Sequence, residues 1–351
     1  MISFILQVLA VVFGLGFLVF IHELGHFSFA KLYKVKVLKF TLGFGREIWG
    51  FTKGETRYSV CLFPLGGMVA MAGENPDEAK GEKDEFLSLP FYKKIMIIFA
   101  GPFMNYVLAV VMFAFIFNLW GVATISDKSY VGALAESGCA KTAGLETNDK
   151  ITYIDGVEIN DWLTLIENIK DKAEKVINLK VVRDDKELEF NFVLDKNPAT
   201  GAGMLGIQPL ITKERLPFLK TISFAGYTVI YQTTFTLQYL WDKLVKWEKP
   251  EVAGPIGVIQ FMANSAKSGL ESYIRLLAVI SVALGLFNLL PIPMVDGGMI
   301  VLFLWEGIIR KKISTKVISI YNYIGLGLIL LIFLFATYSD LIRLGLGKLF
   351  K

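Results

Sequence analysis

Both histidines of the chain fall within one five-residue window, His22-Glu23-Leu24-Gly25-His26. On a helix, residues four positions apart project from the same face, so the two imidazoles can bind one zinc ion. Zinc lowers the pKa of water to near neutrality, and the adjoining Glu23 could accept the proton that such a water releases. Ionisable groups are costly in an apolar helix and usually functional there, which disfavours a silently packed motif.

A third zinc ligand is expected, because catalytic zinc usually takes three protein ligands and keeps one position open. The chain has no further histidine, so the ligand should be a carboxylate. Asp296 is the candidate, as the only ionised side chain in the hydrophobic run from Leu276 to Trp305. The alternative is a kinked helix in which Asp296 bonds to a neighbouring helix.

The sequence around Asp296 predicts an opened helix. Pro291 and Pro293 precede the aspartate, and Gly297 and Gly298 follow it. Proline removes backbone N–H donors and interrupts the helical hydrogen bonds, so backbone groups are freed where water or a peptide could use them.

The composition indicates a protein integral to a lipid bilayer. Of the 351 residues, 54% are hydrophobic, and the mean hydropathy is positive, which is too apolar for an ordinary soluble chain of this length. The formal net charge of +4 is small and no long basic run is present, so no nucleic-acid partner is expected.

Four uncharged or nearly uncharged runs predict four transmembrane helices, at residues 1–21, 95–120, 276–305 and 317–338. A helix of the first run's length spans about 30 Å, the thickness of a bilayer core. A cleaved signal peptide is the alternative for this run. It fits poorly, because there is no basic region before it and no clear small-residue cleavage site.

The distribution of Lys and Arg predicts the orientation. These residues are concentrated in segments 31–94 and 310–316, which should be cytoplasmic, so the N-terminus, region 121–275 and the C-terminus should lie outside. His22, His26 and Asp296 then all reach the cytoplasmic half of the bilayer. A fifth span at 221–241 would move Asp296 about a membrane thickness from the histidines. The metal site therefore favours a surface-lying amphipathic segment over residues 213–271.

The central region changes character. From Gly121 to about Leu210 charged residues, glycines and short β-rich runs alternate, which is typical of a soluble α/β-type module. The predicted strands are Lys150–Ile154, Val176–Arg183 and Leu188–Leu194.

With these motifs in this order, the chain resembles the site-2 proteases, in the bacterial branch of the regulator-of-sigma-E protease. The zinc motif is followed by Gly101-Pro102-x-x-Asn105 and by Asn288-x-x-Pro291-x-Pro293-x-x-Asp296-Gly297. The resemblance implies that Asp296 is the third ligand of Zn²⁺, that Glu23 is the general base, and that substrate is bound near Asn288, Pro291, Pro293 and Asn105. A helix-capping role is the alternative for Asn288.

Two further segments extend the resemblance. Tyr58 to Glu74, with Pro64-Leu65-Gly66-Gly67, is similar to a membrane re-entrant β-hairpin in which Gly66 and Gly67 would contact substrate; a cytoplasmic hairpin is the alternative. A sheet edge there could take an extended peptide as an added strand. The central module resembles a circularly permuted PDZ domain. Its peptide-binding loop would contain Gly203, Leu205, Gly206 and Ile207, unless the domain acts only as a steric filter.

The predicted protein is a polytopic α-helical membrane protein with four transmembrane helices, a re-entrant β-hairpin and an inserted extracytoplasmic PDZ domain. Its parts are residues 1–120 and 272–351 in the membrane, the PDZ domain at 121–212 and the linker at 213–271. The resemblance implies a zinc protease of the bacterial inner membrane that cuts single-span proteins, such as anti-sigma factors and remnant signal peptides, after a first cut by a site-1-type protease. A non-catalytic peptide-binding scaffold and a metal transporter are the alternatives, and Glu23 argues against the scaffold because structural zinc needs no free carboxylate beside it.

Overall fold

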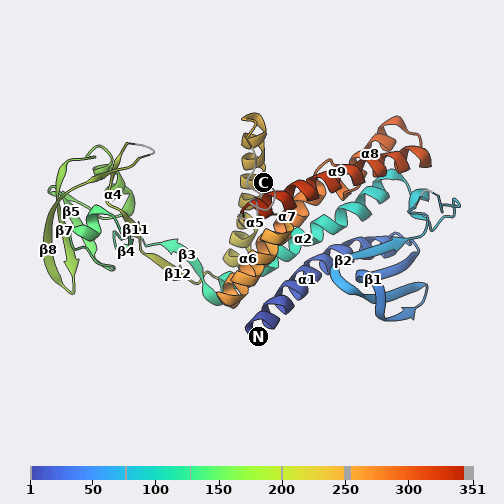
Figure 1. Cartoon of the computed structure of the whole chain (residues 1–351), viewed down its shortest axis with the longest axis horizontal. Coiled ribbons are helices and arrows are strands. Elements are labelled where there is room, and N and C mark those ends of the chain that lie inside the picture. Colours follow the sequence, from blue (N-terminus) through green and yellow to red (C-terminus); the bar gives the residue numbers. More distant parts are fainter. Residues whose placement is uncertain (1, 76, 127, 199–200, 249–253, 344–351) are drawn as a thin grey trace. The chain divides into compact units, whose positions relative to one another are not determined.

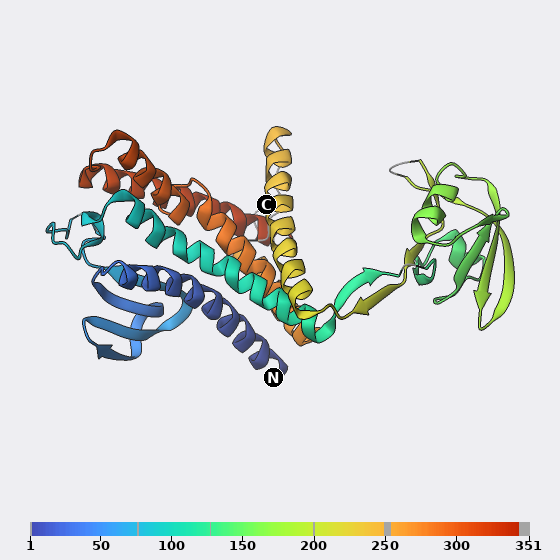
Figure 2. The same ribbon diagram turned by 180° about the vertical axis from the view of Figure 1, so that it is seen from behind.

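The computed structural model describes residues 2–75, 77–126, 128–198, 201–248 and 254–343. The chain forms two compact units, and the second is inserted into the sequence of the first (Figures 1 and 2). The first unit comprises Met1–Phe117 and Pro217–Lys351, and the second comprises Asn118–Leu216.

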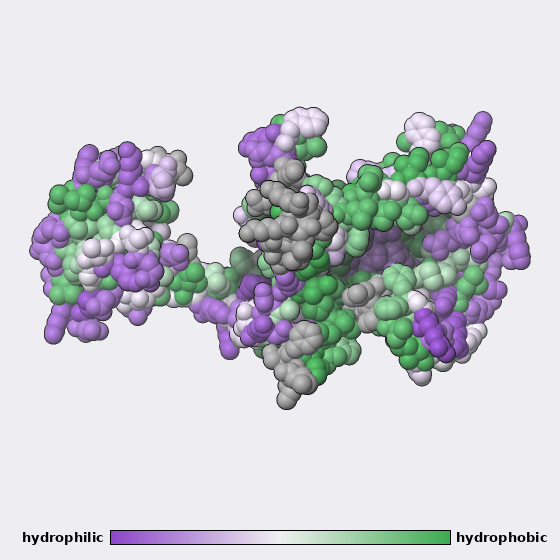
Figure 3. Space-filling view, in the orientation of Figure 1, coloured by the Kyte–Doolittle hydropathy of each residue, from purple (hydrophilic) through white to green (hydrophobic). Residues whose placement is uncertain are grey.

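Long apolar helices make up most of the first unit. Four helical segments are long and apolar enough to cross a membrane: Ile5–Leu32 in α1 (Ile2–Leu32), α2 (Phe91–Trp120), α7 (Leu270–Leu289) and α9 (Thr315–Arg343). Many large apolar side chains on them are exposed, and Figure 3 shows apolar residues along much of this unit's surface. Such surfaces are suited to lipid, which is as apolar as the side chains themselves.

The third hydrophobic run is divided into two helices. Helix α7 ends at Leu289, and α8 (Asp296–Ile309) begins at the aspartate itself. Leu290, directly before Pro291, is extended, because the helical region is disfavoured for a residue that precedes proline, and the chain then turns at residues 293–294. A Cβ on Gly298 would lie 1.9 Å from the carbonyl oxygen of Ile292, so only glycine lets the start of α8 pack against this turn. The predicted opening of the helix is thus a complete break.

A curled β-hairpin precedes α2. Its strands β1 (Val37–Lys53) and β2 (Thr56–Met71) both bend, so the start of β1 has partners on two sides. On one side, residues 39–42 pair with residues 70–67, which run in the opposite direction. On the other side, the same four residues pair with residues 57–60, which run in the same direction. Residues 67–71 therefore form one edge of the sheet, and no pairing on their other side occurs among the described residues. The prediction placed the hairpin at Tyr58–Glu74 and missed β1, so those bounds were wrong.

Two further helices and a 3₁₀ turn complete the first unit: α5 (Phe218–Val245), α6 (Pro255–Lys267) and η1 (Phe86–Ser88). Helix α5 contains the ambiguous segment 221–241 and is not among the four candidate spans. Helix α6 packs against α1, α7 and α9. Its N-terminus is held by the buried Asp340 of α9, which accepts the backbone N–H groups of Gly254 at 3.1 Å and Gly257 at 2.9 Å. A carboxylate at a helix N-terminus satisfies donors that have no intrahelical partner.

The second unit is a small α/β module around a core that includes Ile151, Ile177 and Leu179. Its four-stranded sheet has the order β6 (Val157–Glu158), β5 (Lys150–Ile154), β7 (Val176–Arg183) and β8 (Lys186–Val193). Short strands form three pairs, which are β3 (Val122–Ile125) with β12 (Ile211–Glu214), β4 (Val131–Leu134) with β11 (Ile207–Pro209), and β9 (Asp195–Lys196) with β10 (Gly203–Met204). The helices are α3 (Cys139–Thr142) and α4 (Trp162–Ile169). Two predicted strands coincide with β5 and β7, and the third overlaps β8.

Candidate metal centre and active site

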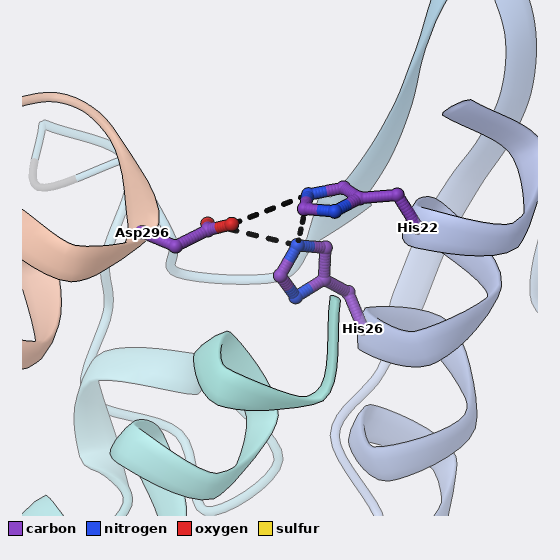
Figure 4. Close-up of side chains that lie close together, drawn as sticks. All are labelled: His22, His26 and Asp296. Atoms are coloured by element: carbon purple, nitrogen blue, oxygen red, sulfur yellow. Dashed lines mark hydrogen bonds and ion pairs between the residues drawn. The ribbon is translucent and has the colours of Figure 1, made fainter. Parts of the chain in front are cut away.

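Three side chains converge from two helices that are far apart in the sequence (Figure 4). His22 and His26 project from one face of α1, and Asp296 is the first residue of α8. The Nε2 atoms of the two imidazoles are 3.1 Å apart. Oδ2 of Asp296 lies 3.2 Å from Nε2 of His22, and its Oδ1 lies 3.6 Å from Nε2 of His26. The structure thus brings the three predicted ligands together.

The donor set fits zinc. Ligand atoms at roughly 2.0–2.1 Å from a tetrahedral zinc ion lie about 3.3 Å from one another. The Nε2–Nε2 distance of 3.1 Å and the 3.2 Å distance from His22 Nε2 to Oδ2 of Asp296 are both close to that value. The Nδ1 atom of His26 is 2.9 Å from the carbonyl oxygen of Ile97. Because a carbonyl oxygen can only accept, Nδ1 of His26 must carry the proton in this hydrogen bond. In that tautomer the lone pair is on Nε2, toward Asp296. Among the described residues, His22, His26 and Asp296 form the one group of three or more His, Cys, Asp or Glu side chains that could hold a metal ion.

Close packing of α1 on α2 depends on two glycines. A Cβ on Gly25 would lie 2.2 Å from the carbonyl oxygen of Ala100. A Cβ on Gly101 would lie 2.3 Å from Nε2 of His26 and 2.9 Å from Cε1 of His22. The glycine of the predicted Gly101-Pro102-x-x-Asn105 motif therefore leaves room for the imidazoles, because any side chain at this position would displace them.

A cavity of about 340 Å³ lies beside the three ligands. Glu23 lines it, together with the edge segment of β2 at Gly67, Met68, Val69 and Met71. The backbone N–H of Val69 is a hydrogen-bond partner of the Glu23 carboxylate. A Cβ on Gly67 would lie 2.8 Å from Cγ of Glu23, so a glycine is required for the edge to approach the carboxylate this closely.

The other predicted substrate residues are not among the residues that line this cavity: Gly66, Asn105, Asn288, Pro291 and Pro293. Gly66 has φ of 125° and stands against the ring of Phe44, so it shapes the strand. Asn105 is 0% exposed and contacts His22. Asn288 lies in the last turn of α7, at the break that precedes Asp296.

Sequence reasoning missed two polar groups in the cavity. Glu74 follows β2, and Asn322 lies on α9. Burial raises the pKa of the Glu74 carboxyl. The backbone N–H of Met71 donates a hydrogen bond of 3.1 Å to the same carboxylate, and this bond lowers the pKa. An acidic residue directly after the glycine-rich strand was the available signal for Glu74. The sequence offers no such signal for Asn322.

A buried ion pair fixes α8 against α2. Lys94 donates to Glu306 at 2.6 Å, and their side chains are only 1% and 8% exposed. The Lys94 ammonium also lies 4.4 Å from the centre of the Phe303 ring. The third hydrophobic run was predicted to end at Trp305, so Glu306 was counted outside it and no partner was sought for its charge. Residues 307–309 are again apolar, which was the signal that Glu306 lies within the run.

The second unit carries a separate groove of about 360 Å³. One wall is α4, through Trp162, Leu165 and Ile169, and the other is the segment 203–209. All four residues predicted to bind a peptide line it, namely Gly203, Leu205, Gly206 and Ile207. A Cβ on Gly203 would lie 2.2 Å from the carbonyl oxygen of Ile169, so this glycine lets the loop reach the helix.

Three side chains that could hold a metal ion, with a glutamate beside them and with helices apolar enough to span a membrane, fit a membrane-embedded metalloprotease. Residues 10–332 match the sequence model of Peptidase family M50. The chain therefore belongs to this family, the site-2 proteases. The protein is accordingly a multi-pass intramembrane zinc metalloprotease with Zn²⁺ as its cofactor.

Relatives cover nearly the whole chain. Cj1068 of Campylobacter jejuni, named as an inferred zinc metalloprotease, is 32% identical and covers 97% of this chain and 94% of its own length. The regulator of sigma-W protease RasP of Bacillus subtilis is 28% identical, with 97% and 99% covered. Among solved structures, the PDZ domain of the SdrC-like protein Lmo2051 from Listeria monocytogenes is similar over 25% of this chain and 94% of its own, at 23% identity and a TM-score of 0.23.

Proposed function

We propose that His22, His26 and Asp296 bind the zinc ion and that Glu23 is the general base of peptide hydrolysis. The observation that carries the proposal is a single cavity that contains these side chains and the free edge of β2. Bound zinc would supply Lewis acidity that activates water and polarises the scissile carbonyl. Glu23 accepts the proton of the attacking water and passes it to the leaving amine.

The edge of β2 is proposed to hold the substrate. A transmembrane helix hides its peptide bonds, so the cut segment has to be extended before hydrolysis. Residues 67–71 have no strand partner on this side among the described residues, and an added strand there would lie beside Glu23 and take over the Val69 and Met71 N–H groups that Glu23 and Glu74 now accept. Gly66 and Gly67 would keep this edge accessible, and Asn288, Pro291 and Pro293, at the break before Asp296, are proposed to contact the substrate backbone.

The hairpin is proposed to re-enter the membrane. Several large apolar side chains on it are exposed, including Phe44, Ile48, Trp49 and Phe63 at 52–64%. In water such a surface would be unfavourable, whereas lipid would accept it. Backbone in lipid must be hydrogen-bonded, which the strand pairing of the hairpin largely provides.

The substrates are proposed to be single-span membrane proteins in the bacterial inner membrane, cut after a site-1-type protease has trimmed them. Anti-sigma factors are one such class, and RasP is named a regulator of sigma-W protease. Remnant signal peptides are another. The active site would lie toward the cytoplasmic half of the bilayer, because Lys and Arg gather in segments 31–94 and 310–316.

The second unit is proposed to be an extracytoplasmic PDZ domain spanning about residues 121–212. Its groove has the composition of a peptide site, with an apolar helix wall and backbone groups of segment 203–209 opposite. It would select trimmed substrates, either by docking a new C-terminus or by excluding bulky outer domains. Residues 213–271 would form the surface-lying linker, since α5 is not among the candidate spans.

Cleavage in detergent tests this function. Two single-span substrates are compared, one with a polyleucine segment and one with helix-destabilising Asn-Gly pairs in the same segment. The destabilised substrate should be cut, and a zinc chelator should stop the reaction until zinc is added back. Cleavage that persists after chelation would exclude the metal mechanism, and equal rates for the two substrates would exclude presentation as a strand.

A further inference from the structure

Asn105 of α2 belongs to the predicted motifs, and its side chain touches a zinc-site imidazole from outside the cavity. Its side chain is 0% exposed, so a substrate cannot reach it without rearrangement of α2. Its amide lies 3.2 Å from Nδ1 of His22. The backbone carbonyl of the same residue accepts from the hydroxyl of Ser281 on α7 at 2.8 Å, a contact that does not involve the side-chain amide.

The tautomer of His22 determines what this amide must do. Nε2 of His22 faces Asp296 and His26, so it has to present a lone pair when zinc is bound. The proton of the neutral imidazole is then on Nδ1, which becomes a donor. The Nδ1 partner must consequently be an acceptor, and the only acceptor of the Asn105 side chain is Oδ1.

The amide can supply that acceptor without losing a contact. In the structure Nδ2 faces His22, whereas Oδ1 is buried and has no hydrogen-bond partner among the described residues. A half-turn about the Cβ–Cγ bond exchanges the two atoms in place. Oδ1 then takes the place of Nδ2 beside His22, and the –NH₂ group occupies the position of an oxygen that had no partner, so the contact with His22 is kept with its direction reversed and no other hydrogen bond is broken.

We propose that Asn105 is a positioning residue of the zinc site: its amide oxygen accepts Nδ1–H of His22 and thereby directs the Nε2 lone pair of His22 toward the metal. The inference rests on the proposed zinc site. On the other side of the site, the Ile97 carbonyl does the same for His26 at 2.9 Å. Helix α2 therefore orients both histidines of α1, one through a side chain and one through its backbone. Partners of this kind typically change metal affinity 10–100-fold.

The test compares zinc dissociation constants of the purified full-length protein, measured by competition with a chromogenic chelator, for Asn105→Ala, Asn105→Leu and Asn105→Asp. Ala and Leu lack an acceptor, so zinc affinity should fall about 10–100-fold. Asp retains an acceptor oxygen, so its affinity should stay within about threefold of the wild type. A purely structural role predicts the reverse order, because a buried carboxylate is the least tolerated of the three.

Two controls separate the possible failures. Ser281→Ala removes the neighbouring buried hydrogen bond on the Asn105 backbone and should leave zinc affinity unchanged. His22→Ala should abolish stoichiometric binding, and normal binding by that variant would refute the proposed zinc site itself. Wild-type affinity in Asn105→Ala, or a loss in Asn105→Asp as large as in Asn105→Ala, would overturn the role of Asn105 alone. Cobalt substitution provides a second readout, since the absorption spectrum of bound Co²⁺ should change in the Ala and Leu variants but not in the Asp variant.

Discussion

The two units contain cavities of nearly equal volume, about 340 Å³ and 360 Å³, with opposite linings. The first gathers two histidines and three carboxylates, from Glu23, Glu74 and Asp296. The second has a single ionisable side chain, Lys170, among apolar groups and backbone. Concentrating charge in a cavity is costly and is suited to chemistry, whereas an apolar groove beside free backbone groups is suited to recognition of a peptide.

The two cavities also differ in how far apart in the sequence their lining residues lie. The first cavity joins side chains of α1, β2, α8 and α9, so it exists only when most of the helical unit is assembled. The second is lined by residues of one small module, from the segment 162–170, from Asn197 and from the segment 202–209. Damage to helix packing should therefore affect the first cavity and leave the second intact.

Replacing Asp296 with Ala should have the largest effect on the first cavity. The change removes one of three ligand atoms, so zinc affinity should fall more than about 100-fold, which exceeds the effect of losing a residue that only orients a ligand, and cleavage should become undetectable. Peptide binding to the second unit should be unaffected. Metal content and turnover are measured on the same preparation. Normal values of both would contradict the proposal that Asp296 is a zinc ligand.

Replacing Gly101 with Ala should reduce zinc affinity about 10–100-fold, an effect comparable to the loss of a second-shell partner. The new methyl group would stand 2.3 Å from Nε2 of His26 and force the imidazole aside. Gly327→Ala on α9 is the matched control, because no atom lies within 4 Å of its Cβ position. Chelator competition provides the measurement, and equal affinities in the two variants would refute the packing argument.

Breaking the Lys94–Glu306 pair should destabilise the first unit without altering the site's chemistry. Removing one partner leaves a buried charge uncompensated, at a cost of about 3–5 kcal/mol. Thermal unfolding in detergent should show a lower midpoint for Lys94→Met. Adding Glu306→Leu should restore most of the loss, and a double variant as unstable as the single one would show that the charge pair is not the cause.

Deleting the second unit should have the smallest effect on chemistry. Removal of residues 126–210, with a short Gly-Ser linker, keeps the paired strands β3 and β12 as a stem. No described residue of the second unit lines the first cavity, so the rate on a trimmed substrate should change less than about threefold. The same variant should cut an untrimmed substrate that the intact enzyme rejects. Loss of cleavage of the trimmed form would mean that the groove delivers substrate.

The sequence was most informative where geometry is local. His22 and His26 are four residues apart on a helix, and that spacing alone places both imidazoles on one face. Asp296 was found because it is the only charge in its hydrophobic run. The strands β5 and β7 were found because their apolar runs are bounded by turn residues. Each of these predictions needs only neighbouring residues.

The sequence was least informative where contacts are distant. Asn322 reaches the cavity only because α9 packs beside the break before α8, which no local pattern indicates. Strand β1 was missed because Lys39, Arg46 and Lys53 served only to assign the segment to the cytoplasmic side, although Phe40, Leu42 and Phe44 alternate as a strand requires. The contact of Asn105 with His22 joins residues 83 positions apart.

Replacement of Glu23 with Gln tests the central claim most directly. The variant retains both imidazoles and Asp296, so the protein should still bind one zinc ion with an affinity close to that of the wild type. It loses the proton acceptor, and cleavage of the destabilised single-span substrate should fall by about 10²–10⁴-fold. Zinc content and turnover are measured on the same preparation. Full activity with zinc bound would contradict the account, because hydrolysis would then proceed without the carboxylate that the cavity places beside the metal site.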